Sequence, residues 1–194
     1  MGTRSEALAT QFEGRVRDAV AVVEALSDAD WTRVTEAERW PVGVTAHHLA
    51  SAFEPVAGIV TGMASGQAPG HFTSAMLDAM NAQHAREHAD CTRAETIALL
   101  ERGAAAAAAV IRGLTDQQLA IRVTVFADAP PMSVEDMITG ALIHHVDDHI
   151  GSIRRTVGAP ASGRETMKDT ADEPGTGAGR YSQGRLHPDG RRWP

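Results

Sequence analysis

The stretch HHVDDHIGS, residues 144–152, places three histidines and two aspartates within six consecutive positions. Imidazole nitrogens and carboxylate oxygens bind metal ions and carry protons, so this composition suits a metal site or a proton relay. The same composition is equally typical of a polar helix surface that has no chemical role. The choice depends on which face of the local element each side chain occupies.

A helical wheel separates these residues. At 100° per residue, His149 lies about 40° from His145, and Ile138 and Leu142 lie within about 60° of His145. His145 and His149 are therefore predicted on the apolar, core-facing stripe, where a pair spaced by four residues can chelate one cation. Hydrogen-bonded core histidines show the same spacing, so both interpretations stay open. The other ionisable residues of the stretch fall on the flank or the solvent side: His144, Asp147 and Asp148.

A third inward-facing histidine is predicted on a separate helix. In VTAHHLASAF, His48 lies on the apolar face of the helix, whereas His47 lies on its flank. If this helix packs against the last one, His48, His145 and His149 bring three neutral imidazoles together. A divalent metal held by three protein ligands keeps an open position for water or substrate.

Other polar residues are weaker candidates for a functional site. His84 and His88 are also spaced by four, but the polar residues around them in NAQHAREHAD indicate a solvated helix. Asn81 and Glu54 are candidates for lining a cavity. Cys91, the only cysteine, has no recognisable base beside it and is expected to be a small packing residue rather than a nucleophile.

The composition excludes several classes of protein. The net charge is −7 and no basic stripe is interleaved with aromatic residues, so neither nucleic acid nor an anionic membrane is expected as a partner. No apolar run reaches the roughly 18 residues of a membrane span, and the N-terminus lacks the apolar stretch of a signal peptide. We therefore expect a cytoplasmic protein that acts on a small-molecule substrate.

The elements that must position the histidines are helices. Apolar residues recur at intervals of three and four, which predicts helices over residues 5–26, 42–65, 73–113 and 134–157. The third helix is expected to break near Cys91, because Thr92 and Glu95 have the spacing of a capping box. Ser133 and Asp136 offer another N-terminal cap, at the start of the last helix. Pro55 is expected to kink or divide the second helix.

The remaining segments are interpreted as connections and a tail. Residues 27–41 break the helical pattern, and residues 121–133 alternate like an extended segment that ends in a Pro-Pro turn. Residues 161–194 contain almost no aliphatic side chains and many Gly, Pro and charged residues, which predicts a disordered C-terminal tail. The sequence thus predicts an all-α four-helix bundle over residues 1–160, with a short extended excursion before the last helix.

Two motifs resemble those of the DinB-like (YfiT-like) metalloprotein superfamily. WPVGVTAHHLA, residues 40–50, looks like the family's tryptophan-then-histidine segment, in which a histidine followed by leucine lies on the second helix. HVDDHIGSI, residues 145–153, resembles the family's later histidine pair, which is followed by an aliphatic residue, glycine and usually glutamine. Ser152 stands in place of that glutamine. The likeness extends over about residues 5–158.

The resemblance implies a four-helix bundle that holds one divalent metal, Zn, Ni or Fe, through His48, His145 and His149. Relatives in this family include enzymes that use mycothiol, bacillithiol or glutathione, among them S-transferases and a maleylpyruvate isomerase. A low-molecular-weight thiol is therefore the implied cosubstrate, which the metal would activate by lowering the pKa of the thiol.

Three functions fit these residues. The first is a metal-dependent thiol S-transferase or isomerase of the mycothiol or bacillithiol type. The second is a metal-dependent hydrolase that uses a metal-activated water. The third is a non-catalytic module that binds a metal or a small ligand. A homodimer formed through an outer helix face is also expected.

Overall fold

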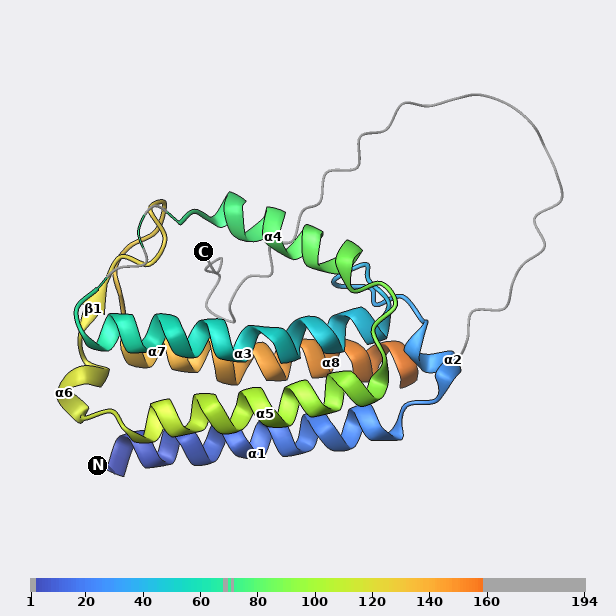
Figure 1. Ribbon diagram of the computed structural model, residues 1–194, viewed down its shortest axis with the longest axis horizontal. Helices are drawn as coiled ribbons and strands as arrows, with labels where there is room; N and C mark the ends of the chain where they lie inside the picture. The colour runs from blue at the N-terminus through green and yellow to red at the C-terminus, as the bar shows by residue number, and fades with distance from the viewer. Residues whose placement is uncertain (1–2, 68–69, 71, 159–194) are drawn as a thin grey trace, which may run out of the picture.

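The computed structural model describes residues 3–67, 70 and 72–158, and within these residues four long helical segments form a bundle (Figure 1). The first three segments are α1 (Thr3–Ala25), α3 (Val42–Ala64) and α5 (Arg93–Arg112). The fourth consists of α7 (Val134–Ile138), the π-helical turn η1 (Thr139–His144) and α8 (His145–Gly158). α1 packs against α5, and α3 packs against both α5 and α8. The predicted all-α four-helix bundle is confirmed.

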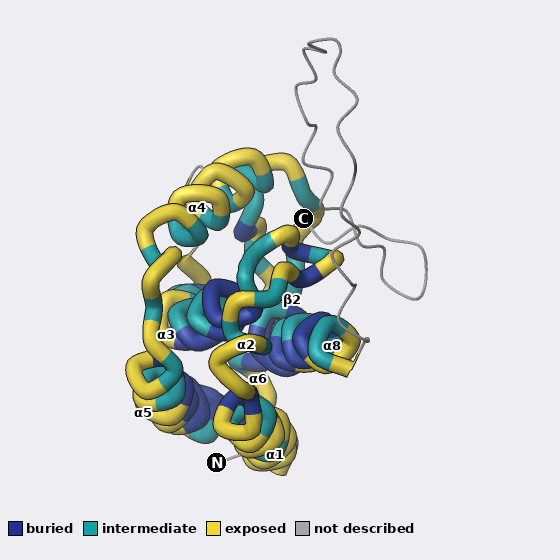
Figure 2. The backbone as a smooth tube through the Cα atoms, turned by 90° about the vertical axis from the view of Figure 1, so that its right-hand side faces the viewer, coloured by how far each residue is buried: buried dark blue, intermediate teal, exposed yellow. Residues whose placement is uncertain are grey.

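Shorter elements connect the long helices. α2 (Asp28–Trp31) lies in the connection after α1, and α6 (Asp116–Leu119) follows α5. β1 (Arg122–Val123) pairs antiparallel with β2 (Met132–Ser133) just before α7, which confirms the predicted extended excursion. α4 (Ser74–Glu87) runs outside the bundle, and none of its residues is fully buried (Figure 2).

Capping residues begin two of the helices where the sequence predicts. The Thr92 hydroxyl accepts a hydrogen bond from the N–H of Glu95 at 3.3 Å, and the Glu95 carboxylate accepts one from the N–H of Thr92 at 3.2 Å. This capping box begins α5 and separates it from α4, as expected. Ser133 and Asp136 form a second capping box at the start of α7.

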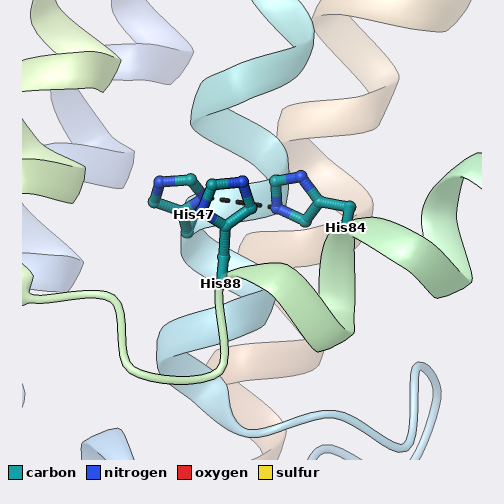
Figure 3. Close-up of side chains that lie close together, drawn as sticks. All are labelled: His47, His84 and His88. Atoms are coloured by element: carbon teal, nitrogen blue, oxygen red, sulfur yellow. Dashed lines mark hydrogen bonds between the residues drawn. The ribbon is translucent and has the colours of Figure 1, made fainter.

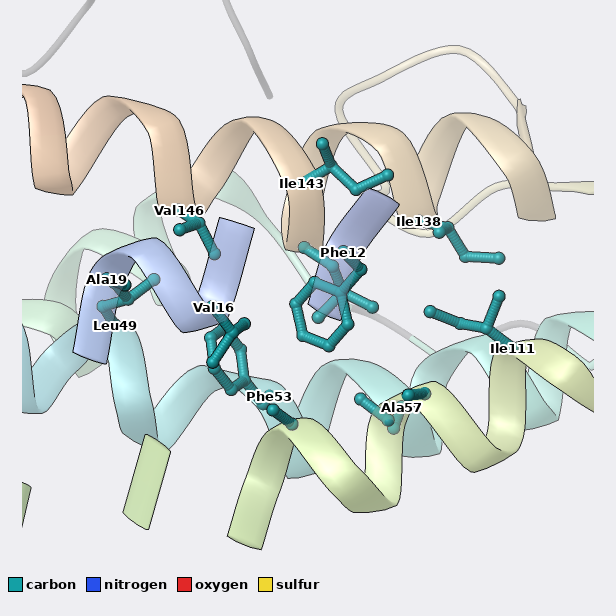
Figure 4. Close-up of a cluster of buried hydrophobic side chains, with 14 of the residues drawn as sticks. Phe12, Val16, Ala19, Leu49, Phe53, Ala57, Ile111, Ile138, Ile143 and Val146 are labelled. Atoms are coloured by element: carbon teal, nitrogen blue, oxygen red, sulfur yellow. The ribbon is translucent and has the colours of Figure 1, made fainter. Parts of the chain in front are cut away.

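The core consists of apolar residues from all four helical segments (Figure 4). The rings of Phe12 and Phe53 meet edge to face with their centroids 5.1 Å apart, and both side chains are fully buried. α5 approaches α3 closely at Gly103, where a Cβ would lie 3.2 Å from the Cβ of Phe53. Such dense packing holds the helices at fixed spacing and so fixes the side chains on their other faces.

Two helices differ from the prediction. α3 continues through Pro55 as one helix, so it is not divided there, and Pro55 is exposed. The alternative expectation, a kink at Pro55, stays a prediction. The predicted last helix contains η1, whose hydrogen bonds close over one more residue than those of an α-helix. The predicted tail, residues 161–194, and the domain boundary at residue 160 lie outside the described residues. Among the described helices, none is long and apolar enough to cross a membrane.

Candidate metal centre

Three histidines from two helices meet at one side of the bundle. His48 comes from α3, and His145 and His149 come from the beginning of α8. Each offers a ring nitrogen, and these nitrogens all lie within 4.8 Å of one another. The ring centroid of His48 lies 5.4 Å from that of His145 and 5.2 Å from that of His149. The structure thus brings together the three residues that the sequence predicts as metal ligands.

The π-helical turn η1 determines which way these histidines face. After η1, the buried apolar residues of α8 are Val146, Ile150 and Ile153, and Ser152 is buried beside them against Glu38. Val146 is one residue, and hence about 100°, further round the helix than His145. His145 and His149 therefore lie beside the core stripe and line a cavity, which corrects the prediction that they share the core-facing stripe. The physical reason is the extra residue of η1, which rotates the core stripe relative to a continuous α-helix.

Glu38, in the connection between α1 and α3, supports the cluster. Its Oε1 lies 3.1 Å from Nδ1 of His149, and its Oε2 accepts a hydrogen bond from the Ser152 hydroxyl at 2.6 Å. Burial opposes the ionisation of Glu38, but hydrogen bonds from His149 and Ser152 outweigh it and lower the pKa of Glu38 to about 2. An ionised carboxylate only accepts hydrogen bonds, so His149 carries its proton on Nδ1 and keeps Nε2 free for a metal.

A tight turn presents Glu38 to the bundle. The N–H of Thr35 donates to the carbonyl of Trp40 at 2.8 Å, and the N–H of Arg39 donates to the carbonyl of Thr35 at 3.1 Å. Arg39 adopts a φ of 62°, a left-handed conformation that is uncommon for a residue other than glycine. The sequence pattern of residues 27–41 indicates only a connection and does not point to Glu38, because a lone acid in a turn gives no periodic signal.

Burial keeps the other two rings uncharged. It is the main reason why the pKa of His48 falls to about 3, and the nearby His149 lowers it further. Burial also lowers the pKa of His145 well below its usual value. Nδ1 of His145 is buried and has no hydrogen-bond partner among the described residues, which is costly in free energy. A set of neutral imidazoles with an unsatisfied nitrogen fits a divalent metal such as Zn, Ni or Fe.

The histidine cluster opens into a cavity of about 890 Å³. The cavity walls are mainly apolar, and their residues include Val56, Ile59, Phe72, Leu77, Met80, Phe126, Met132 and Met137. Asn81 lines the cavity, as the sequence suggested. Glu54 is not among the lining residues and lies 3.9 Å from Arg102 in an ion pair. A cavity of this character suits a small, largely apolar molecule.

Cys91 lies at the end of the connection from α4 to α5, directly before the N-cap residue Thr92, and is not among the residues that line the cavity. Burial raises the pKa of its thiol, which disfavours the thiolate form that a nucleophile requires. The carbonyl of Cys91 accepts a hydrogen bond from Nε1 of Trp31 at 3.1 Å. These contacts are those of a packing residue, in agreement with the expectation for Cys91.

His84 and His88 differ from the prediction of a solvated helix. Both lie against His47 of α3, and their ring nitrogens lie within 4.8 Å of one another and of that of His47 (Figure 3). Only the three-dimensional packing of α4 on α3 brings these residues together, because 37 positions separate His47 from His84. The flank position predicted for His47 is thus the face that α4 covers.

Comparisons with known proteins bear on both the fold and the family. The sequence profile of the DinB superfamily matches residues 11–153. The solved structure of YfiT from Bacillus subtilis, described as a probable metal-dependent hydrolase with an unusual four-helix bundle topology, matches with a TM-score of 0.63. This match has 18% sequence identity and covers 81% of this chain and 90% of that chain, so it shows a shared fold. A search of curated proteins found no match.

Proposed function

Because the chain belongs to the DinB superfamily, we propose that it is a metal-dependent enzyme whose divalent ion is held by His48, His145 and His149. Its reaction is the transfer of a low-molecular-weight thiol to a small apolar electrophile, or an isomerisation that uses such a thiol. The observation that carries this proposal is the cavity of about 890 Å³ beside the histidines. Ligand sites span about 300–1,000 Å³, so a cavity near the upper end has room for two reactants.

In this site the histidines would hold the metal, and the apolar walls of the cavity would bind the reactants. A divalent ion bound there supplies positive charge that lowers the pKa of a neighbouring thiol or water. His48 and His145 present neutral rings, and Glu38 keeps the proton of His149 on Nδ1 so that Nε2 remains a ligand. The apolar walls bind the electrophile and exclude bulk water, which strengthens electrostatic interactions inside the cavity.

The nucleophile is expected to come from outside the protein. Cys91 is not a lining residue, and its thiol pKa is raised by burial. The hydroxyl of Ser51 donates to the carbonyl of His48 at 2.9 Å, and that of Ser152 donates to Glu38 at 2.6 Å. A free thiol or water therefore supplies the attacking atom.

A metal-dependent hydrolase is the second candidate. It is favoured by the fold shared with YfiT, which is described as a probable metal-dependent hydrolase. Water needs far less room than a thiol cosubstrate, so a hydrolase would use the cavity for a single larger substrate. The same three histidines would hold the metal in either case.

The two candidates are separated by supplying or withholding a thiol. Purified protein is loaded with Zn, Ni or Fe and mixed with a chromogenic haloarene and mycothiol, bacillithiol or glutathione. Thiol transfer forms a carbon–sulfur bond and releases halide and a proton, so conjugate and halide should appear together. A chromogenic ester without thiol tests hydrolysis in parallel.

Three outcomes decide the assignment. Conjugate that disappears in His145→Ala and after chelation supports the thiol transferase. Ester hydrolysis with the same dependence, and no conjugate with any thiol, replaces it with the hydrolase. If the protein binds no metal after incubation with all three ions, the proposed function is wrong.

A further inference from the structure

His47, His84 and His88 form a second histidine cluster, which shares no residue with the first. His47 extends from α3, His84 from α4, and His88 is the C-cap residue of α4. One ring nitrogen of each residue lies within 4.8 Å of the other two. The rings of His47 and His88 stack with centroids 4.2 Å apart, and those of His84 and His88 lie 4.5 Å apart (Figure 3).

One pair of nitrogens in this cluster has the separation of two ligands of the same metal ion. Nδ1 of His47 lies 3.2 Å from Nε2 of His84. Two imidazole nitrogens bound tetrahedrally to one ion at about 2.0–2.1 Å are about 3.3–3.4 Å apart. A hydrogen bond between neutral rings has a similar length, but it engages only two of the three imidazoles. The third ring, that of His88, makes the set a potential chelate.

Burial and the neighbouring imidazoles lower the pKa of His47 and His84, so these rings are neutral, but two carboxylates near the second cluster would attract a bound cation. Glu95 at the start of α5 interacts favourably with positive charge on His47, and Glu87 does so with positive charge on His84. Carboxylates on two sides would offset part of the charge of a bound divalent ion. Three imidazoles with an open fourth position match the ligand sets that Zn accepts.

α4 is the element that such an ion would hold. None of its residues is fully buried, so apolar packing on the bundle contributes little to its position. Near its start, the N–H of Ser74 lies 3.2 Å from a carboxylate oxygen of Asp128. α4 nevertheless forms a wall of the cavity through Leu77, Met80, Asn81, Gln83, His84 and Glu87. An ion shared by α3 and α4 would therefore fix this wall.

We propose that His47, His84 and His88 form a second divalent-metal site, which fastens α4 to α3 across the wall of the cavity. His47 and His48 are neighbours on α3 and point about 100° apart, so one helical turn serves both sites. The inference concerns a second ion and does not rest on the thiol chemistry proposed above.

The test is a count of bound Zn by elemental analysis after the full-length protein is dialysed against excess Zn and then against metal-free buffer. The wild type should retain two ions per chain, and His145→Ala and His88→Ala one each. The double variant should retain none, and His144→Ala, a matched histidine deletion outside both clusters, should retain two. His84→Gln serves as a second variant if His88→Ala fails to fold, as judged by circular dichroism.

Hydrogen exchange of residues 74–88 gives an independent readout. In His145→Ala, where only the second site remains, adding Zn should slow exchange across α4 at least tenfold, and adding His88→Ala should abolish the effect. A single ion in the wild type, with His88→Ala unchanged, overturns the proposal while leaving the first site intact. Loss of all Zn in His145→Ala overturns it as well, because the second cluster would then bind nothing alone.

Discussion

Replacing Glu38 tests how far the metal centre depends on a residue that does not touch the metal. Glu38 accepts hydrogen bonds from Nδ1 of His149 at 3.1 Å and from Ser152 at 2.6 Å. Partners of this kind typically contribute 10–100-fold in metal affinity, and a hydrogen bond to a charged group contributes about 1.5–3 kcal/mol. Glu38→Gln keeps an acceptor for His149 but loses the charge, so Zn affinity should fall about tenfold, or about 1.4 kcal/mol.

Glu38→Ala removes both hydrogen bonds and should weaken Zn binding about 100-fold, or about 2.7 kcal/mol. Glu36→Gln is the matched control, because this exposed acid lies two residues away in the same turn. The affinity of Glu36→Gln for Zn should stay within about twofold of that of the wild type, because removing an exposed charge usually has little effect.

Competition with a chromophoric chelator at pH 7.5 measures these affinities. The titrations are best made in a His88→Ala background, so that the second histidine cluster does not contribute. Equal affinities for Glu38→Gln, Glu38→Ala and Glu36→Gln would refute the reasoning, because the His149 tautomer would then not depend on Glu38.

Three further predictions concern stability and catalysis. The chelator-treated protein should lose stability as the pH falls below 6.5, because unfolded His48 takes up a proton near its ordinary pKa of 6.5 whereas the folded residue, with a pKa of about 3, does not. Between pH 7.5 and 5.5 this residue alone should lower the free energy of unfolding by about 1.4 kcal/mol, which urea denaturation can measure. A free energy of unfolding that does not change over this pH range would contradict the prediction. Gly43→Ala should destabilise the fold by about 1–3 kcal/mol, because its Cβ would lie 2.4 Å from the Trp31 ring. Gly58→Ala, whose Cβ would meet nothing within 4 Å, should be neutral or stabilising, and thermal melts of the two variants measure this difference. Cys91→Ser should leave the rate of thiol conjugation within about twofold, and a large loss would mean that this thiol takes part.

Much of the helical framework could be predicted because it depends on local signals. Apolar periodicity located the long helices, and the Thr92–Glu95 and Ser133–Asp136 spacings located two helix starts. His48, His145 and His149 could be predicted as a set because each lies on a helix of the bundle, although η1 moves the pair on α8 from the predicted core stripe to its edge. Metal binding by these residues, and the homodimer, stay predictions.

The parts that could not be predicted depend on tertiary contacts. Glu38 reaches His149 through a turn closed by the left-handed Arg39, and nothing in the local pattern indicates that geometry. His84 and His88 have polar neighbours, so periodicity indicated a solvent face. α4 instead turns these rings toward His47, and this depends on where the chain returns after α3.

The π-helical turn η1, from Thr139 to His144, makes the metal centre sensitive to changes in chain length. Deleting one residue within the turn would allow an ordinary α-helix to form there and would rotate α8 by about 100° relative to α7. The fourth helical segment could then keep either the apolar face of α7 in the core or the histidines of α8 at the cavity, but not both. A homologue that lacks this residue should therefore retain the bundle and lose the histidine cluster, even where every aligned histidine is present. An alignment of relatives should be checked for a one-residue gap at this turn before the metal site is transferred between them.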